Sequence, residues 1–119
     1  MHKTSTKSVK YNISEIDLEH IIPKSKFINT DERNRYCNSL GNCTLFEKSN
    51  SGSYHKGNRS VQNKDWETKK KFYETSSIIM NRQLAQSHDT FDYSVIEKRE
   101  TELAFKLFDI TEQFLTIKT

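Results

Sequence analysis

The feature that most constrains the fold is a β-prone segment that ends at the only proline in the chain. Its aliphatic residues are Ile13, Ile16, Leu18, Ile21 and Ile22. Proline has no N–H to donate to a β-ladder, so a strand over this segment cannot continue past Pro23. The pattern therefore predicts a strand between residues 11 and 22.

Three polar residues, Asp17, Glu19 and His20, interrupt this apolar segment. Burying an ionised carboxylate is unfavourable unless it is paired or bound to a metal, so two carboxylates beside an imidazole indicate a candidate hydrolytic site. A regular strand would place Asp17 and Glu19 on one face and His20 on the other. Glu19 and His20 can face one centre only where regular strand geometry ends, and we predict that the strand breaks at His20. On its own, the segment is also compatible with three polar residues on the solvated face of an edge strand.

The chain after Pro23 predicts a short helix and then a second strand. The helix is expected over residues 31–39, with Thr30 as its N-cap and Gly41 at its end. Residues 42–46 form a β-prone run that can pair with the first strand as the second arm of an irregular hairpin. Residues 47–62 contain two of the three glycines and several serines, which predicts a loop or an irregular helix.

The second half of the chain is predicted to be helical. Asn63 can cap a helix over residues 63–75, with Trp66 facing the core. The three consecutive lysines at positions 69–71 are expected on the solvated face of that helix.

Two further helices are expected after it. Ser76 or Ser77 can cap a helix over residues 78–86, and a capping box formed by Ser94 and Glu97 opens the longest helix. In that last helix the apolar residues recur at spacings of seven, four, three and four, which predicts a stripe that faces the core: Ile96, Leu103, Leu107, Ile110 and Phe114.

Composition bounds the remaining possibilities. A chain of 119 residues forms one domain with a modest core, since only 33% of its residues are hydrophobic and 29% are charged. The net charge of +3 allows a polyanionic partner without requiring one. Cys37 and Cys43 lack the spacing and number of a zinc framework and are expected to be free thiols. With no signal peptide or long apolar run, we expect a cytoplasmic protein with no membrane contact, in which residues 1–10 are a flexible lead.

Three ordered motifs give the chain a specific resemblance. Residues 17–23 (DLEHIIP), residues 40–46 (LGNCTLF) and a following Asn50 resemble the ββα-metal site of HNH, or His-Me finger, endonucleases. The closest branch is the HNH domain at the C-terminus of GmrSD-like, modification-dependent restriction proteins, whose closing helix resembles residues 94–108. The resemblance implies an α+β fold for residues 11–119, with a ββα-metal core at about residues 14–62 and helical support over residues 63–117.

The resemblance also implies a role for each matching residue. His20 stands where the family has its general base, which takes a proton from the attacking water. Asn42 matches the middle asparagine, which fixes the hairpin and holds the orientation of the histidine. Glu19 matches an acidic metal ligand, Asp17 is a possible auxiliary ligand, and Asn50 falls at the ligand position carried by a helix.

The distal ligand has alternatives. The spacing between the middle asparagine and the ligand asparagine is nine residues in much of the superfamily, whereas Asn42 and Asn50 are eight apart. His55 or Asn58 could therefore take the place of Asn50. Oxygen ligands from Glu19 and an asparagine would favour Mg²⁺ or Mn²⁺ over zinc.

The implied substrate is DNA, bound through its phosphates with little base specificity. Four cations near the motif are candidates for phosphate contacts, with ordinary solubilising charge as the alternative: Lys24, Lys48, Lys56 and Arg59. By resemblance, the parent protein couples the nuclease to an NTP-using sensor domain and acts in defence against phage. The rival interpretation is a catalytically degenerate module that binds nucleic acid or another protein.

Overall fold

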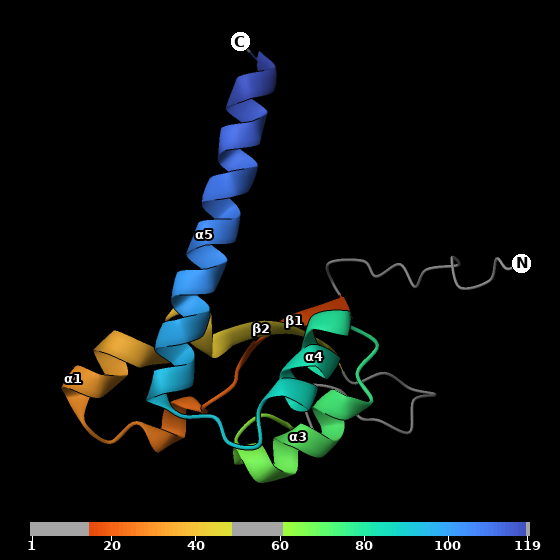
Figure 1. The fold of residues 1–119 in the computed structure, drawn as a ribbon. Helices are drawn as coiled ribbons and strands as arrows, with labels where there is room; N and C mark the ends of the chain where they lie inside the picture. The colour runs from red at the N-terminus through yellow and green to blue at the C-terminus, as the bar shows by residue number, and fades with distance from the viewer. Residues whose placement is uncertain (1–14, 49–60, 119) are drawn as a thin grey trace, which may run out of the picture.

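The computed structural model describes residues 15–48 and 61–118, and within the last helix it describes side chains as far as residue 113. These residues form an antiparallel β-hairpin with helices packed around it, which confirms the α+β class (Figure 1). In chain order the elements are β1 (Ile16–His20), η3 (Lys24–Lys26), α1 (Thr30–Glu32), η4 (Arg33–Cys37), η5 (Leu40–Asn42), β2 (Cys43–Glu47), α3 (Trp66–Glu74), α4 (Ile79–Ser87) and α5 (Tyr93–Lys118).

The hairpin has one buried face and one exposed face. Glu19 pairs with Thr44, and all three of Glu19, Thr44 and Phe46 are buried against the helices. On the other face, Leu18 pairs with Leu45, and these side chains are 60% and 52% exposed. β1 ends at His20, as the sequence predicts.

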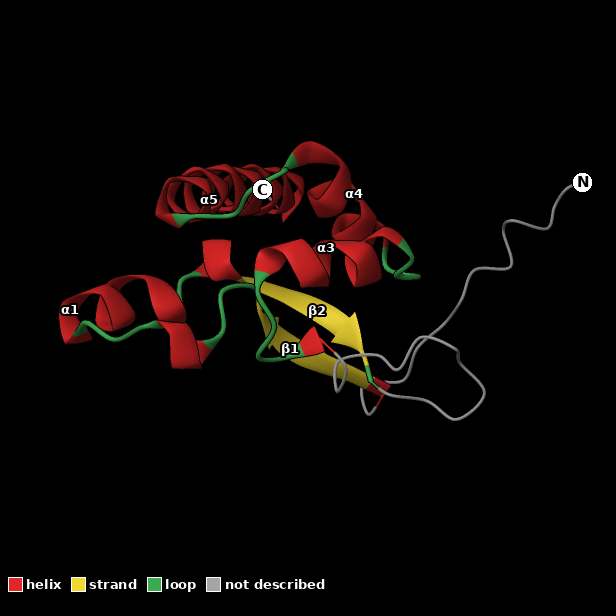
Figure 2. Ribbon diagram, turned by 90° about the horizontal axis from the view of Figure 1, so that it is seen from below, coloured by secondary structure: helices red, strands yellow, loops and turns green. Residues whose placement is uncertain are grey.

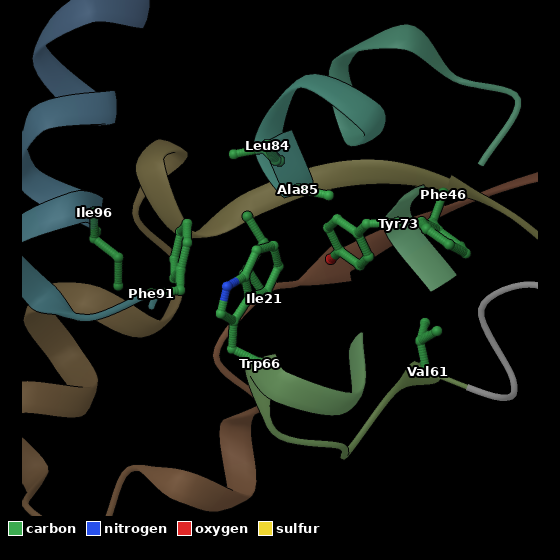
Figure 3. Packing of buried hydrophobic residues seen from close by; sticks show 9 residues of the cluster. All are labelled: Ile21, Phe46, Val61, Trp66, Tyr73, Leu84, Ala85, Phe91 and Ile96. Carbon is green, nitrogen blue, oxygen red and sulfur yellow. The ribbon is translucent and has the colours of Figure 1, made fainter. Parts of the chain in front are cut away.

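Helices α3, α4 and α5 lie on one side of the hairpin (Figure 2). α3 packs against α4, α4 contacts β2, and α5 contacts the short η5 turn. The core between them holds Ile21, Phe46, Val61, Trp66, Tyr73, Leu84, Ala85, Phe91 and Ile96 (Figure 3). Trp66 packs edge-on against Tyr73 with 5.2 Å between ring centroids, so aromatic contacts contribute much of this small core.

Two predicted helix caps are wrong by one or two residues. Asn29, not Thr30, caps α1, because its side-chain oxygen accepts from the Glu32 N–H at 3.0 Å. Asp65 caps α3 by accepting from the Thr68 N–H at 3.1 Å, while Asn63 lies outside the helix with a positive φ of 73°. In both cases the residue immediately before the helix reaches the orphan N–H groups.

The later caps also differ from the predictions. α4 begins at Ile79 without a side-chain cap on its N–H groups, and Ser76 instead accepts from the N–H of Ile78 at 3.1 Å. At the start of α5, Asp92 accepts from the Val95 N–H at 3.2 Å, which replaces the expected capping box. Glu97 points elsewhere and binds residues of η4.

Gly41 lies in η5 and does not end the preceding helix, which closes at Cys37. A Cβ atom at this position would overlap the backbone carbonyl of Ile96 in α5. The glycine therefore permits close approach between η5 and α5, and the Arg99 guanidinium donates to the Gly41 carbonyl at the same contact.

The predicted core stripe of the longest helix is wrong beyond its first turns. Ile96 is fully buried and Leu103 is partly buried, but Leu107 and Ile110 are 62% and 64% exposed. The reason is that α5 extends away from the rest of the domain, as Figure 1 shows. Among the described helices, none combines the length and apolarity needed to cross a bilayer.

Candidate active site around His20

His20 occupies the last position of β1, and contacts on three sides hold it there. Its carbonyl accepts from the Lys69 ammonium at 2.7 Å, and the next N–H, that of Ile21, donates to the Asn42 carbonyl at 2.8 Å. Its ring Nε2 lies 2.8 Å from the side-chain oxygen of Asn38. The ring is partly exposed, so it is both fixed and accessible to solvent.

Asn42 is completely buried and braces two chain segments. Its side-chain oxygen accepts from the Ile22 N–H at 2.8 Å, and its amide nitrogen donates to the Ile22 and Cys37 carbonyls at 3.1 and 2.9 Å. Ile22 follows His20 by two residues, and Cys37 precedes Asn38. One buried amide thus ties the segment that carries the histidine to the segment that contacts its ring.

Glu19 is 2% exposed and lies beside a buried cation. Its Oε2 atom accepts from the Lys69 ammonium at 2.6 Å and from the Tyr73 hydroxyl at 2.8 Å. Lys69 is fully buried, so the prediction that all three lysines lie on the solvated face of α3 is wrong for this one. Its burial is possible because a carboxylate and a carbonyl satisfy the ammonium group.

The protonation of this cluster follows from its burial. Burial lowers the pKa of Lys69, and the Glu19 carboxylate offsets part of that shift. Burial and the same carboxylate raise the pKa of Tyr73 well above its ordinary value. The phenol therefore stays protonated and donates to Glu19 across the physiological range.

A hollow of about 260 Å³ opens beside His20. Glu19, His20 and Lys24 line it from the first strand and the turn that follows, and Gln62 and Asn63 line it from the segment before α3. The positive φ of Asn63 places an uncommon backbone conformation at this wall. The residues that line the hollow thus include a histidine, a glutamate, a lysine and two residues with side-chain amides.

The other predicted site residues lie apart from this hollow or beyond the described structure. Asp17 shares the buried face of β1 with Glu19 but is partly exposed and lies 3.6 Å from the Lys48 ammonium. The remaining candidates lie outside the described residues: Asn50, His55, Lys56, Asn58 and Arg59.

A comparison with family models places the chain. The model described as the C-terminal domain of GmrSD restriction endonucleases matches residues 1–106. The chain belongs to this family. Comparison with curated proteins and with solved structures gives no match. The match confirms the resemblance to the C-terminal domain of GmrSD-like restriction proteins and makes the chain a domain related to restriction endonucleases.

The donor set of this GmrSD domain suits a hard divalent cation. Within residues 15–48 and 61–118, no three His, Cys, Asp or Glu side chains gather closely enough to bind a metal. Glu19, Gln62 and Asn63 line the hollow and carry side-chain oxygen atoms, and oxygen ligands with several waters are what Mg²⁺ and Mn²⁺ prefer. Lys69 and Tyr73 would orient the carboxylate, as outer partners of a metal ligand do.

Sequence reasoning missed three residues of the GmrSD domain that contact the residues of this site: Asn38, Lys69 and Tyr73. Trp66, Lys69 and Tyr73 are spaced three and four residues apart on one helical face, so the position of Lys69 on the buried face of α3 could have been predicted from Trp66. Asn38 gave no comparable signal, because its contact with His20 depends on how η4 folds back. Both cysteines are free thiols, as predicted.

Proposed function

We propose that this domain is a metal-dependent endonuclease of the HNH type, which hydrolyses DNA phosphodiester bonds with His20 as general base. The observation that carries the proposal is the placement of His20 at a strand end, held by its backbone and its ring beside a hollow lined by Glu19. An imidazole suits this task because its ordinary pKa lies near physiological pH.

Each residue of the motif has a part in the proposed reaction. His20 accepts a proton from the attacking water, and Asn42 holds the segment on which His20 lies. Glu19 is the acidic metal ligand, and Asn50 is proposed as the distal ligand, with His55 and Asn58 as alternatives. A bound Mg²⁺ or Mn²⁺ would supply positive charge to the phosphate and the leaving oxygen.

The proposed substrate contacts are phosphate contacts. Lys24 lines the hollow and is exposed, so it is placed to neutralise a phosphate near the scissile bond. Lys48 is exposed, and its ammonium group lies 3.6 Å from the Asp17 carboxylate. Because Asp17 has this cationic partner, its proposed role is that of an auxiliary metal ligand at most. Lys56 and Arg59 complete the proposed set. Because the proposed contacts are with phosphates, the domain would read few base edges. Its parent protein would then select the target through an NTP-using sensor domain, in defence against phage.

A plasmid assay tests the general base. Supercoiled DNA is incubated with the domain and Mg²⁺ or Mn²⁺, and open-circle and linear products are separated on a gel. His20→Ala should lower the nicking rate by about 10²- to 10⁴-fold, the usual contribution of a general base. The control is His88→Ala, since His88 lies at the end of α4 and lines a different hollow. Nicking that survives in the His20 variant removes the assignment.

A binding measurement separates the enzyme from a degenerate binding module. Calorimetric titration with Mn²⁺ should show one site in the wild type and a loss of affinity of at least 10-fold in Glu19→Gln. Circular dichroism of the variant checks that the buried cluster still folds. A module that binds only DNA or protein would give no heat of Mn²⁺ binding, either in the wild type or in Glu19→Gln.

A further inference from the structure

We infer that Asn38 is a positioning residue, which holds the neutral ring of His20 with its proton on Nε2 and its basic lone pair on Nδ1. The inference deepens the proposed function, since it names the atom of His20 that acts as the base. It starts from one contact, the 2.8 Å separation between His20 Nε2 and Asn38 Oδ1.

The chemistry of the two groups sets the direction of this hydrogen bond. An amide oxygen carries no proton and can only accept, so the ring nitrogen that faces it must donate. A neutral imidazole has one N–H, and when Nε2 holds it the lone pair lies on Nδ1. The ring nitrogen available to a water molecule is then Nδ1.

The fold fixes this contact from both sides. Asn42 binds Ile22 after the histidine and Cys37 before Asn38, so the two segments cannot slide past each other. The η4 helix that ends next to Asn38 is fastened to α5, because Tyr36 donates to Glu97 at 2.6 Å. The backbone at Asn38 is therefore fixed, which keeps its side-chain amide next to the His20 ring.

Only the proton of the attacking water moves in the step that Asn38 supports. It passes from the water oxygen to His20 Nδ1, and the ring becomes an imidazolium. As the hydroxide forms its bond to phosphorus, the bond from phosphorus to the leaving oxygen breaks, and the leaving oxygen takes a proton from solvent afterwards. The proton on Nε2 remains there and stays hydrogen-bonded to the Asn38 oxygen throughout the step. This hydrogen bond keeps the ring orientation unchanged and stabilises the imidazolium. Loss of Asn38 would free the ring to rotate and to exchange tautomers.

The tautomer can be read directly by NMR. In protein labelled with ¹⁵N-histidine, two-bond couplings between ring protons and ring nitrogens show which nitrogen carries the proton, at about pH 8.5, two units above the ordinary histidine pKa. The wild type should show the proton on Nε2 alone. Asn38→Leu should give a mixture of both tautomers. A proton found on Nδ1 in the wild type would mean that the Asn38 amide faces the ring through its nitrogen, and would overturn the inference.

Matched variants connect the tautomer to the reaction. Asn38 is exposed, so its replacement spares the core, and a thermal melt checks this. Asn38→Leu should slow nicking by about 10- to 100-fold, the usual effect of losing the outer partner of an active-site histidine. Asn38→Asp keeps an acceptor and should restore the single tautomer and most of the rate at the same pH. Asn34→Leu, inside η4 and also exposed, should change neither.

The outcomes separate the two proposals. An unchanged tautomer and rate in Asn38→Leu would overturn the role of Asn38 and leave His20 as the base. Nicking by His20→Ala would overturn the base itself, whatever the tautomer.

Discussion

Lys69 is a single side chain that binds two neighbouring residues of the site. It is fully buried, and its ammonium group binds both the Glu19 carboxylate and the His20 carbonyl. The motif around His20 could be predicted from the sequence because its residues are contiguous and its chemistry is unusual for a strand. The partners of those residues could not all be predicted, because Asn38 reaches His20 through the folded path of η4.

Removing Lys69 should therefore destabilise the domain strongly. Lys69→Met leaves Glu19 buried without its cation, and we expect the free energy of unfolding to fall by about 3–5 kcal/mol, measured by urea denaturation. The double variant Lys69→Met/Glu19→Gln should recover part of this loss, because it removes the uncompensated charge. Lys70→Met is the control and should change stability by less than about 1 kcal/mol, since its ion pairs are partly exposed. A single Lys69 variant as stable as the wild type would contradict the buried pair.

The backbone at Asn63 gives a second prediction on the scale of one residue. Its φ of 73° suits glycine and, to a lesser degree, asparagine. Asn63→Gly should leave the melting temperature unchanged or slightly higher, while Asn63→Ala should lower stability by about 1 kcal/mol. Equal melting temperatures for the two variants would show that the positive φ is not kept in solution.

The elements are joined at a few tight contacts, and the sequence predicted the elements better than the contacts. The hairpin and the helices were predicted from residue patterns, and the break at His20 was predicted from the need for Glu19 and His20 to face one centre. The caps were misplaced because several polar residues lie near each helix start. The contact between η5 and α5 could not be predicted, because only the fold places Gly41 against the Ile96 carbonyl.

Gly41 tests that contact. Gly41→Ala would force apart two backbones that cannot yield by changing a rotamer, and we expect a loss of about 3 kcal/mol or more in chemical denaturation. Leu40→Ala is the control, since Leu40 is the adjacent residue, is 51% exposed and should cost less than about 1 kcal/mol. Similar stabilities for the two variants would show that η5 and α5 are not in close contact.

Glu47 joins the end of β2 to the connection between α3 and α4. Partial burial raises its pKa, but hydrogen bonds from Ser76 Oγ at 2.6 Å and from Ser77 N and Oγ at 2.8 and 2.9 Å outweigh this, so its pKa is lowered. A lowered folded-state pKa gives stability that is present above the unfolded value of about 4.3 and is lost as the pH falls through the folded value. Glu47→Gln should therefore reduce the difference in melting temperature between pH 7 and pH 3. An unchanged difference would contradict this linkage.

On the scale of the whole molecule, the domain is a small core with a long helix that leaves it. Periodicity predicted one continuous core-facing stripe along α5, but it could not indicate where the neighbouring elements stop. The structure buries Ile96 and exposes the apolar residues from Phe105 to Ile110, among them Phe105 and Phe108 at 66% and 59% exposure. Within α5, only the first part should therefore contribute strongly to the stability of the domain.

Substitutions along α5 test this division. Ile96→Ala should lower the free energy of unfolding by about 2–5 kcal/mol, because it leaves a cavity in a closed core. Phe105→Ser and Phe108→Ser should each change it by less than about 1 kcal/mol in the isolated domain. A large loss from either phenylalanine would mean that the exposed part of α5 is covered in solution.

The length of α5 also sets a fixed spacing. Its 26 residues, at about 1.5 Å each, extend over about 39 Å, and a single unbroken helix bends little over that distance. The far end of α5 should therefore keep a constant distance and direction from the hollow beside His20. Two fluorophores, one at Gln113 and one on the hairpin, should report a narrow distribution of distances. A flexible segment of the same length would give a broad one.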